Sequence, residues 1–167
     1  LVTDTARHRL VQVEADFETV VATFGGPEKG YLDGSAEQAR FNEPQGIALV
    51  PTDLRETLGV DVLVADSVNH RLRGLNLRTG QVTTLAGSGV QRLIDGETAR
   101  TDPNHIEPGA DPLTVALSSP WDLVYSREAA AFLVAMAGTH QIFSFDPMTG
   151  QLAVFAGTGA EGLKDGA

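Results

Sequence analysis

Short apolar segments recur along the chain, and each is separated from the next by a small polar turn. Three stretches show the same order: an apolar strand, a polar turn, a histidine and a second strand of alternating pattern. These stretches are residues 1–13, 62–75 and 132–145. Runs of this length bounded by turn-forming residues are typical of β-strands joined by tight turns. The pattern therefore predicts a repeated pair of antiparallel strands.

Two further strand types follow in register along each repeat. Outer strands ending in glycines are predicted at 20–26, 81–89 and 151–159, and innermost strands at 41–49 and 117–125. The hairpins before the outer strands carry Gly80 and Gly150, because glycine accepts a positive φ. Each complete repeat is thus predicted to be a four-stranded antiparallel sheet.

The third strand of each repeat has apolar residues on both of its faces. Val13, Leu75 and Phe145 share one face, and Leu10, Leu72 and Ile142 share the other. A two-layer sandwich would leave one face polar, whereas a propeller blade packs between neighbouring blades. The pattern therefore predicts an all-β propeller built from four-stranded antiparallel blades.

The repeat length shows where extra segments are inserted. The repeated histidines His8, His70 and His140 are 62 and 70 residues apart, whereas a four-stranded blade usually takes about 40–45 residues. The excess is assigned to residues 52–61, whose "LRETLG" is predicted to form a helical turn, and to residues 88–119 between two blades.

The predicted blade boundaries leave the propeller incomplete. They are 1–26 for a partial blade, 41–89 and 117–159 for two complete blades, and 160–167 for the start of the next inter-blade loop. This makes about 2.75 blades, whereas propellers close with about 4–8. We therefore expect the chain to be a fragment cut from a longer protein, with exposed apolar blade faces that cause it to self-associate.

Composition narrows the class of partner. The chain has 167 residues, 42% of them hydrophobic, and 22 acidic against 12 basic residues give a net charge of -10. This acidic balance disfavours nucleic-acid binding, which needs a basic patch. No apolar run reaches the roughly 18 residues of a membrane span, and the absence of cysteine excludes thiol chemistry within this chain. We expect a soluble, cytoplasmic protein.

The motifs "ADSVNHRLR", "ARFNEPQGIAL" and "LAGSG…DG" resemble those of the NHL-repeat family, whose repeats form β-propellers, usually six-bladed. The stretches "SSPWDL" and "AMAGTHQIF" are similar to a narrower group of NHL proteins. In that group a thioredoxin-like domain precedes a six-bladed NHL propeller. The resemblance thus implies a thioredoxin-like domain before Leu1, which would carry any thiol-redox activity.

The stretch "VADSVNHRLR" places Asp66 four residues before His70, a pair that suits acid–base chemistry or metal binding. Repetition favours a structural role instead, because an active site is normally built once and a fold requirement is met in every repeat. The aspartate recurs as Asp4, and the histidine recurs in all three turns. We expect the aspartate to accept turn N–H groups and the histidine to donate to a carbonyl or to that carboxylate. This structural turn motif comprises Asp4, His8, Asp66, His70 and His140.

Four residues are candidates for binding a partner at the blade face. Arg7, Asn69 and Thr139 vary at equivalent turn positions, and Trp121, the only tryptophan, begins an innermost strand. Packing near the axis and ligand stacking both remain open for Trp121. The acidic segment 95–111 is interpreted as a solvated inter-blade loop, with calcium binding as the alternative.

No catalytic residue, metal site or cofactor is predicted. The leading hypothesis is a non-catalytic segment that acts as a protein–protein interaction platform, with a protein partner of unknown identity and neither nucleic acid nor membrane as a partner. The alternative is a propeller enzyme, a metal-dependent lyase or hydrolase in which equivalent histidines ring the axis. Some NHL-type propellers, the peptidyl-amide lyases, hold metal there.

Overall fold

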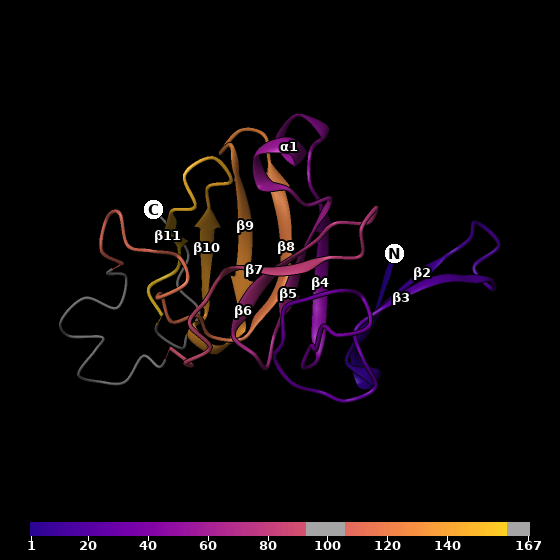
Figure 1. The fold of residues 1–167 in the computed structure, drawn as a ribbon. Helices are drawn as coiled ribbons and strands as arrows, with labels where there is room; N and C mark the ends of the chain where they lie inside the picture. The colour runs from indigo at the N-terminus through magenta and orange to yellow at the C-terminus, as the bar shows by residue number, and fades with distance from the viewer. Residues whose placement is uncertain (93–105, 160–167) are drawn as a thin grey trace.

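The computed structural model describes residues 1–92 and 106–159, which form three antiparallel sheets that we call blades 1, 2 and 3 (Figure 1). Blade 1 has three strands, β1 (Val2–Asp4), β2 (Arg9–Val13) and β3 (Val20–Phe24). Blade 2 has β4 (Pro44–Leu49), β5 (Val62–Asp66), β6 (Arg71–Leu75) and β7 (Val82–Ala86). Blade 3 has β8 (Pro120–Ser126), β9 (Ala131–Met136), β10 (Gln141–Phe145) and β11 (Leu152–Ala156).

The strands within each blade pair in chain order, as the sequence pattern predicts. Blade 2 has the order β4-β5-β6-β7, and blade 3 has the equivalent order β8-β9-β10-β11. The hairpins before the outer strands contain Gly80 and Gly150, with φ values of 71° and 73°, a left-handed conformation that glycine adopts without steric cost.

Short helical elements occupy the turns. The predicted helical turn exists as a 3-10 helix, η2 (Thr52–Leu54), followed by α1 (Arg55–Leu58). Two further 3-10 helices form turns between strands: η1 (Thr5–Arg7) joins β1 to β2 in blade 1, and η3 (Ala137–Thr139) joins β9 to β10 in blade 3. In the described residues, no helix is long and apolar enough to cross a membrane.

Blade 2 is buried on both of its faces. Leu75 packs in a cluster with Leu10 of blade 1, and Leu72 packs in a second cluster with Phe132 and Phe143 of blade 3. All five side chains are 2% exposed or less. Apolar residues on opposite faces of one strand are therefore explained by a neighbouring blade on each side.

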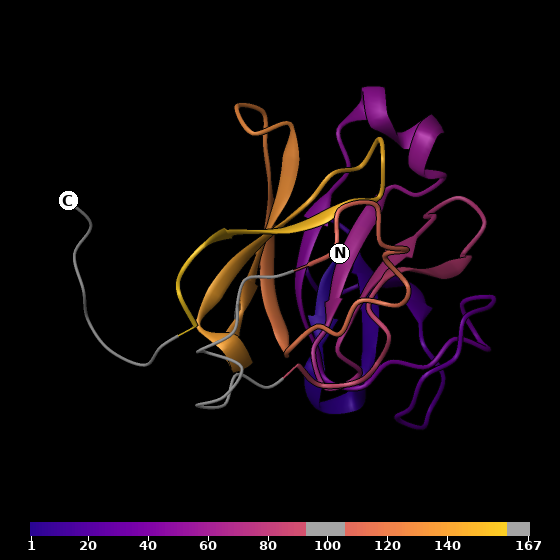
Figure 2. The same cartoon turned by 90° about the vertical axis from the view of Figure 1, so that its left-hand side faces the viewer.

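The far face of blade 3 is covered much less. Figure 2 shows β8–β11 (orange to yellow) beside β4–β7 (magenta), with the other face of the sheet turned away from blade 2. Val124 and Phe155 on that face are 60% and 56% exposed, and they line a groove of about 320 Å³ with Ile142. The equivalent face of blade 2 is the one that packs against blade 3.

Candidate functional site

Asp66 ends β5 and has no exposed surface. Its Oδ2 accepts hydrogen bonds from Nη1 of Arg73 at 2.7 Å and from Nδ2 of Asn69 at 2.8 Å, and its Oδ1 accepts one from the backbone N–H of Asn42 at 2.8 Å. Burial raises the pKa of Asp66, while the charge of Arg73 and these hydrogen bonds act in the opposite direction. This carboxylate is enclosed by the fold and is not placed to meet a substrate.

Arg73, also without exposed surface, connects blade 2 to the segment that precedes it. Its guanidinium donates to Oδ1 of Asp33 at 2.6 Å, to the carbonyl of Leu32 at 2.8 Å and to the carbonyl of Arg40 at 3.0 Å. All three acceptors lie in residues 25–43, which join β3 to β4. One buried cation thus holds the inter-blade segment against its blade.

Asp4, the blade 1 counterpart of Asp66, pairs differently. The position of Arg73 is taken by Val11, and Asp4 instead accepts a hydrogen bond from Nε of Arg9 at 2.9 Å. This bond to Arg9 lowers the pKa of Asp4, and the charges of Arg7 and Arg9 add to the effect.

The turn histidines bind the next blade. Nδ1 of His8 accepts the backbone N–H of Glu43 at 3.1 Å, and Nδ1 of His70 accepts the backbone N–H of Ser119 at 3.1 Å. Glu43 and Ser119 each come directly before an innermost strand. The histidines are therefore hydrogen-bond acceptors between blades, not the donors within one turn that the sequence led us to expect.

This geometry determines the protonation of the imidazole. A nitrogen that accepts a hydrogen bond carries no proton, so His70 is neutral with its hydrogen on Nε2. Burial lowers the pKa of His70 below its ordinary value of 6.5, and the positive charge of Arg71 lowers it further. The backbone of His70 is left-handed, with φ of 53°.

A turn hydroxyl forms a second bond at each of these junctions. Oγ1 of Thr5 donates to the carbonyl of Pro44 at 2.8 Å, and Oγ of Ser67 donates to the carbonyl of Pro120 at 2.5 Å. The two prolines are the first residues of β4 and β8. Each junction thus pairs a hydroxyl and a histidine with the residues that lead into the next blade.

Blade 3 keeps the histidine and loses the other polar groups. His140 has the same left-handed conformation, with φ of 52°, but Ala137 stands where Ser67 has its hydroxyl. Met136 and Phe143, both buried, replace Asp66 and Arg73. The buried ion pair of blade 2 is thus exchanged for an apolar pair.

Two hydroxyls remain beside the replaced aspartate. Oγ of Ser118 and Oγ1 of Thr139 are buried and have no hydrogen-bond partner in the part of the chain that the structure describes. They occupy the positions equivalent to Asn42 and Asn69, which donate hydrogen bonds to Asp66 in blade 2.

The four binding candidates lie in different environments. The side chain of Arg7 is 71% exposed, and Trp121 is 58% exposed. Asn69 is buried and donates to the carbonyl of Gly30 as well as to Asp66, and Thr139 is 1% exposed. Only Arg7 and Trp121 are accessible to a partner, and their role in binding stays a prediction.

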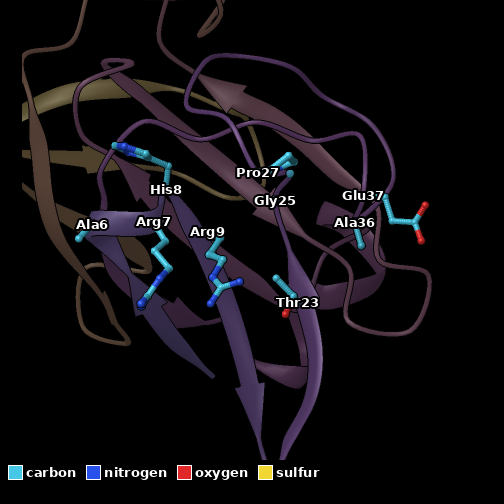
Figure 3. Close-up of a pocket in the computed structure, with 10 residues that line it drawn as sticks. Ala6, Arg7, His8, Arg9, Thr23, Gly25, Pro27, Ala36 and Glu37 are labelled. Atoms are coloured by element: carbon cyan, nitrogen blue, oxygen red, sulfur yellow. The ribbon is translucent and has the colours of Figure 1, made fainter.

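A cavity of about 610 Å³ lies against blade 1 (Figure 3). In the close-up, Arg7 extends from the turn η1, Arg9 from β2 and Thr23 from β3. Glu37 lies across from them on the inter-blade segment. Arg9 is the counterpart of Arg71, whose guanidinium carbon lies 3.7 Å from the ring centre of Tyr31. The comparable place in blade 2 is therefore covered by an aromatic ring of the inter-blade segment.

The described residues contain no group of three or more histidine, cysteine, aspartate or glutamate side chains that could hold a metal ion. His8 and His70 use Nδ1 for blade-to-blade bonds, so that nitrogen is not available as a ligand. Most of the acidic segment 95–111, including His105, lies outside the described residues, as do the "DG" motifs near residues 95 and 165.

Arg73, Asp33 and Asn42 were missed by sequence reasoning. One sequence signal could have identified Arg73. In blade 3, Met136 and Phe143 replace Asp66 and Arg73 together, which indicates that the aspartate and the arginine form a pair. Asn42 contributes its backbone N–H, which its side-chain type does not reveal.

Comparison with known proteins gives relatives that are 31% to 35% identical to this chain. The chain is 31% identical to NHL repeat-containing protein 2 of Gallus gallus over 100% of this chain and 23% of that protein. The human protein of the same name is 32% identical over 91% of this chain and 19% of its own length. The Arabidopsis thaliana protein SUPPRESSOR OF QUENCHING 1, chloroplastic, is 35% identical over 80% of this chain and 11% of its own length. The chain spans less than a quarter of each of these relatives, and no protein-family model matches it.

Solved structures support the fold. A Bacteroides thetaiotaomicron protein of unknown function superimposes with a TM-score of 0.63 at 23% identity, over 91% of this chain and 31% of its own. A Bacteroides ovatus protein described as an auxiliary nutrient binding protein gives 0.60 at 16% identity, over 91% of this chain and 34% of its own. At these identities the likeness concerns the fold alone, and it agrees with a segment of a propeller.

Proposed function

Because this chain belongs to the NHL-repeat β-propeller family, we propose that it is a non-catalytic propeller segment that serves as a protein–protein interaction platform. The observation that carries the proposal is the use of Asp66 and His70. Both groups looked suited to chemistry, but Asp66 is held by Arg73 and by the N–H of Asn42, and His70 binds the N–H of Ser119 before blade 3. A catalytic activity would need residues other than Asp66 and His70.

The platform is the end of the blades where the turns and the starts of the innermost strands meet. Bonds such as Ser67 to Pro120 bring these two sets of residues to one end. Arg7, Val68 and Trp121 are exposed there, with 44% of Val68 and 58% of Trp121 accessible. An exposed cation and an exposed tryptophan are residue types enriched in protein interfaces.

The complete protein is proposed to carry a thioredoxin-like domain before this segment, with any thiol-redox chemistry located in that domain. A cytoplasmic location also stays a prediction. The alternative of an axial metal enzyme is disfavoured by the acceptor role of His8 and His70. Calorimetric titration with zinc and calcium tests that alternative, because heat above the buffer level would revive it.

The proposal is tested by capture of binding proteins with two matched triple variants. One variant changes the turn end: Arg7→Glu, Val68→Glu and Trp121→Ala. The control changes exposed residues at the opposite end: Arg78→Glu, Thr79→Glu and Met148→Glu. We expect a discrete partner that binds the wild type and the control but not the turn-end variant. Equal capture by both variants, or catalytic turnover by the chain itself, would overturn the proposal.

A further inference from the structure

The hairpin loop of blade 1, residues 14–19, differs from the equivalent loops of blades 2 and 3, and we call it the tip. In those two blades the first residue of the loop, Asn76 or Asp146, accepts backbone N–H groups from within the loop. In the tip the accepting residue is Asp16, two positions later, and Phe17 has a left-handed backbone with φ of 58°. That conformation is uncommon for a bulky side chain. The tip is thus a turn of its own kind, with a phenylalanine at its most unusual position.

The bonds of Asp16 fix the shape of the tip. Its Oδ1 accepts the backbone N–H groups of Glu18 and Thr19, each at 2.9 Å, and its Oδ2 accepts the hydroxyl of Thr19 at 2.7 Å. The bonds from Thr19 are the main cause that lowers the pKa of Asp16, so its carboxylate is charged at neutral pH. Phe17 beside it is 83% exposed, more than any other large apolar side chain of the described residues. The tip therefore presents an apolar ring on an ordered turn.

The charges of the tip are all negative. Glu14, Asp16 and Glu18 are exposed, and residues 14–19 include no lysine, arginine or histidine. The hairpin of β2 and β3 projects away from the other two blades (Figure 1). A surface that receives Phe17 therefore needs an apolar hollow with cations beside it.

The cavity of about 610 Å³ in blade 1 has this character. It lies at the other end of blade 1 from the tip, because β2 and β3 run between the two and are five residues long. Five residues of strand span roughly 16 Å, so the tip of one molecule does not reach its own cavity. The lining includes two arginines, one glutamate and three small apolar side chains: Arg7, Arg9, Glu37, Ala6, Pro27 and Ala36.

Arg9 offers a face for an aromatic ring in this cavity. In blade 2 its counterpart, Arg71, has its guanidinium carbon 3.7 Å from the ring centre of Tyr31. Among the described residues, no aromatic ring lies over the guanidinium of Arg9. The hydrogen bond that Nε of Arg9 donates to Asp4 uses the edge of the guanidinium, which leaves its faces for stacking.

We propose that Phe17 of one copy of this chain enters the blade 1 cavity of a second copy and stacks on Arg9, as Tyr31 stacks on Arg71. The carboxylates of the tip then lie near Arg7 and Arg9, and cation–π attraction adds to the burial of the ring. The contact joins two different surfaces, so it produces open chains or rings of molecules and not closed pairs. It does not depend on the proposed platform role, because Phe17 lies at the other end of the blade.

Sedimentation equilibrium of the chain at about 300 micromolar tests this contact. Val124→Lys and Phe155→Lys are included in every protein, so that the exposed face of blade 3 does not contribute. We expect self-association with a dissociation constant on the order of 0.1–1 mM, which suits a small contact surface. Phe17→Asn tolerates the left-handed backbone but lacks the ring, and it should weaken association at least about tenfold. Met148→Asn, which removes an exposed apolar side chain from the equivalent hairpin of blade 3, should leave it unchanged.

A mixture of two variants makes the test specific. Phe17→Asn keeps the cavity but loses the ring, and Arg7→Glu keeps the ring but places a repelling charge at the cavity. Each variant should associate weakly alone, whereas an equimolar mixture should form a dimer with one chain of each kind, because one intact tip and one intact cavity remain. The proposal is overturned if Phe17→Asn associates as strongly as its parent, or if the mixture associates no more than the separate variants.

Discussion

Asp66 and Arg73 form an ion pair of 2.7 Å in which neither side chain has any exposed surface. Two buried charges gain little over well-packed apolar residues, but each becomes costly when the other is removed. Blade 3 illustrates the apolar solution at the same two positions, with Met136 and Phe143. The two complete blades of this chain therefore accept either an ion pair or an apolar pair at these positions. In blade 1, where Val11 takes the arginine position, the aspartate Asp4 pairs with Arg9 instead.

This exchange can be tested by a double-mutant cycle. Arg73→Phe should lower the free energy of unfolding by about 3–5 kcal/mol, because it leaves the buried carboxylate of Asp66 without an opposite charge. Asp66→Met should cost less, because Arg73 keeps its ion pair with Asp33. The double variant, which copies blade 3, should lose less than the sum. It will not recover fully, because Arg73 also donates to the carbonyls of Leu32 and Arg40. Urea unfolding measures all four proteins, and strict additivity of the two single effects would contradict the coupling.

Repetition explains how much of this architecture was predictable from the sequence. The strands and turns recur in three copies. A pattern that occurs in every copy is one that the fold requires, whereas a chance pattern would occur only once. The structural role of Asp66 and His70 followed from the same comparison. The direction of the histidine bond did not, because its partner, the N–H of Ser119, lies 49 positions away and leaves no side-chain signal.

The binding candidates show a second limit of prediction from the sequence, which concerns the exposure of turn residues. Asn69 and Thr139 vary between repeats, and polar turn residues are usually exposed, so sequence variation suggested a contact surface. Both side chains instead face inward, and Asn69 is held by Asp66. The residue at this turn position differs together with the residue three positions before it: Asn69 follows Asp66 in blade 2, and Thr139 follows Met136 in blade 3.

The histidine junction makes stability dependent on pH. The pKa of His70 is lowered in the folded state relative to 6.5, so unfolding is accompanied by proton uptake when the pH falls below about 6.5. The contribution of His70 is therefore complete above that pH and declines as the pH falls toward the lowered folded value. We expect the melting temperature of the wild type to fall between pH 7.5 and pH 5.5.

His70→Asn is the matched control for this effect. Asparagine tolerates the left-handed backbone and offers Oδ1 as an acceptor near the place of Nδ1, but it does not titrate. The difference in stability between wild type and this variant should shrink or reverse on acidification. A difference that stays constant between pH 7.5 and pH 5.5 would mean that His70 does not titrate on unfolding.

Gly87 is expected to be irreplaceable at the junction of blades 2 and 3. It has φ of 100°, and a Cβ there would overlap the carbonyl oxygen of His70. Gly87→Ala should cost about 2–5 kcal/mol, from the left-handed backbone and the steric overlap together. Gly59→Ala is the control, since Gly59 also has a positive φ but a Cβ there meets nothing within 4 Å. That variant should lose only about 1–2 kcal/mol, and equal losses in chemical denaturation would argue against the close approach.

The uncovered face of blade 3 should make the isolated chain self-associate. On blade 2, Leu63, Ala65 and Leu72 are fully buried because blade 3 packs over them. Their counterparts on blade 3 are only partly buried, beside the exposed side chains of Val124 and Phe155.

Contiguous apolar area of this kind drives association between molecules. Analytical ultracentrifugation at tens of micromolar should therefore detect dimers or larger species. Phe155→Lys combined with Val124→Lys should shift the distribution toward monomer, because each lysine places a charge where apolar contact is needed. Val68→Lys, on the exposed turn of blade 2, should leave it unchanged. A monodisperse monomer for the wild-type chain would show that this face does not promote association, and a shift with Val68→Lys would place the contact at the turn end instead.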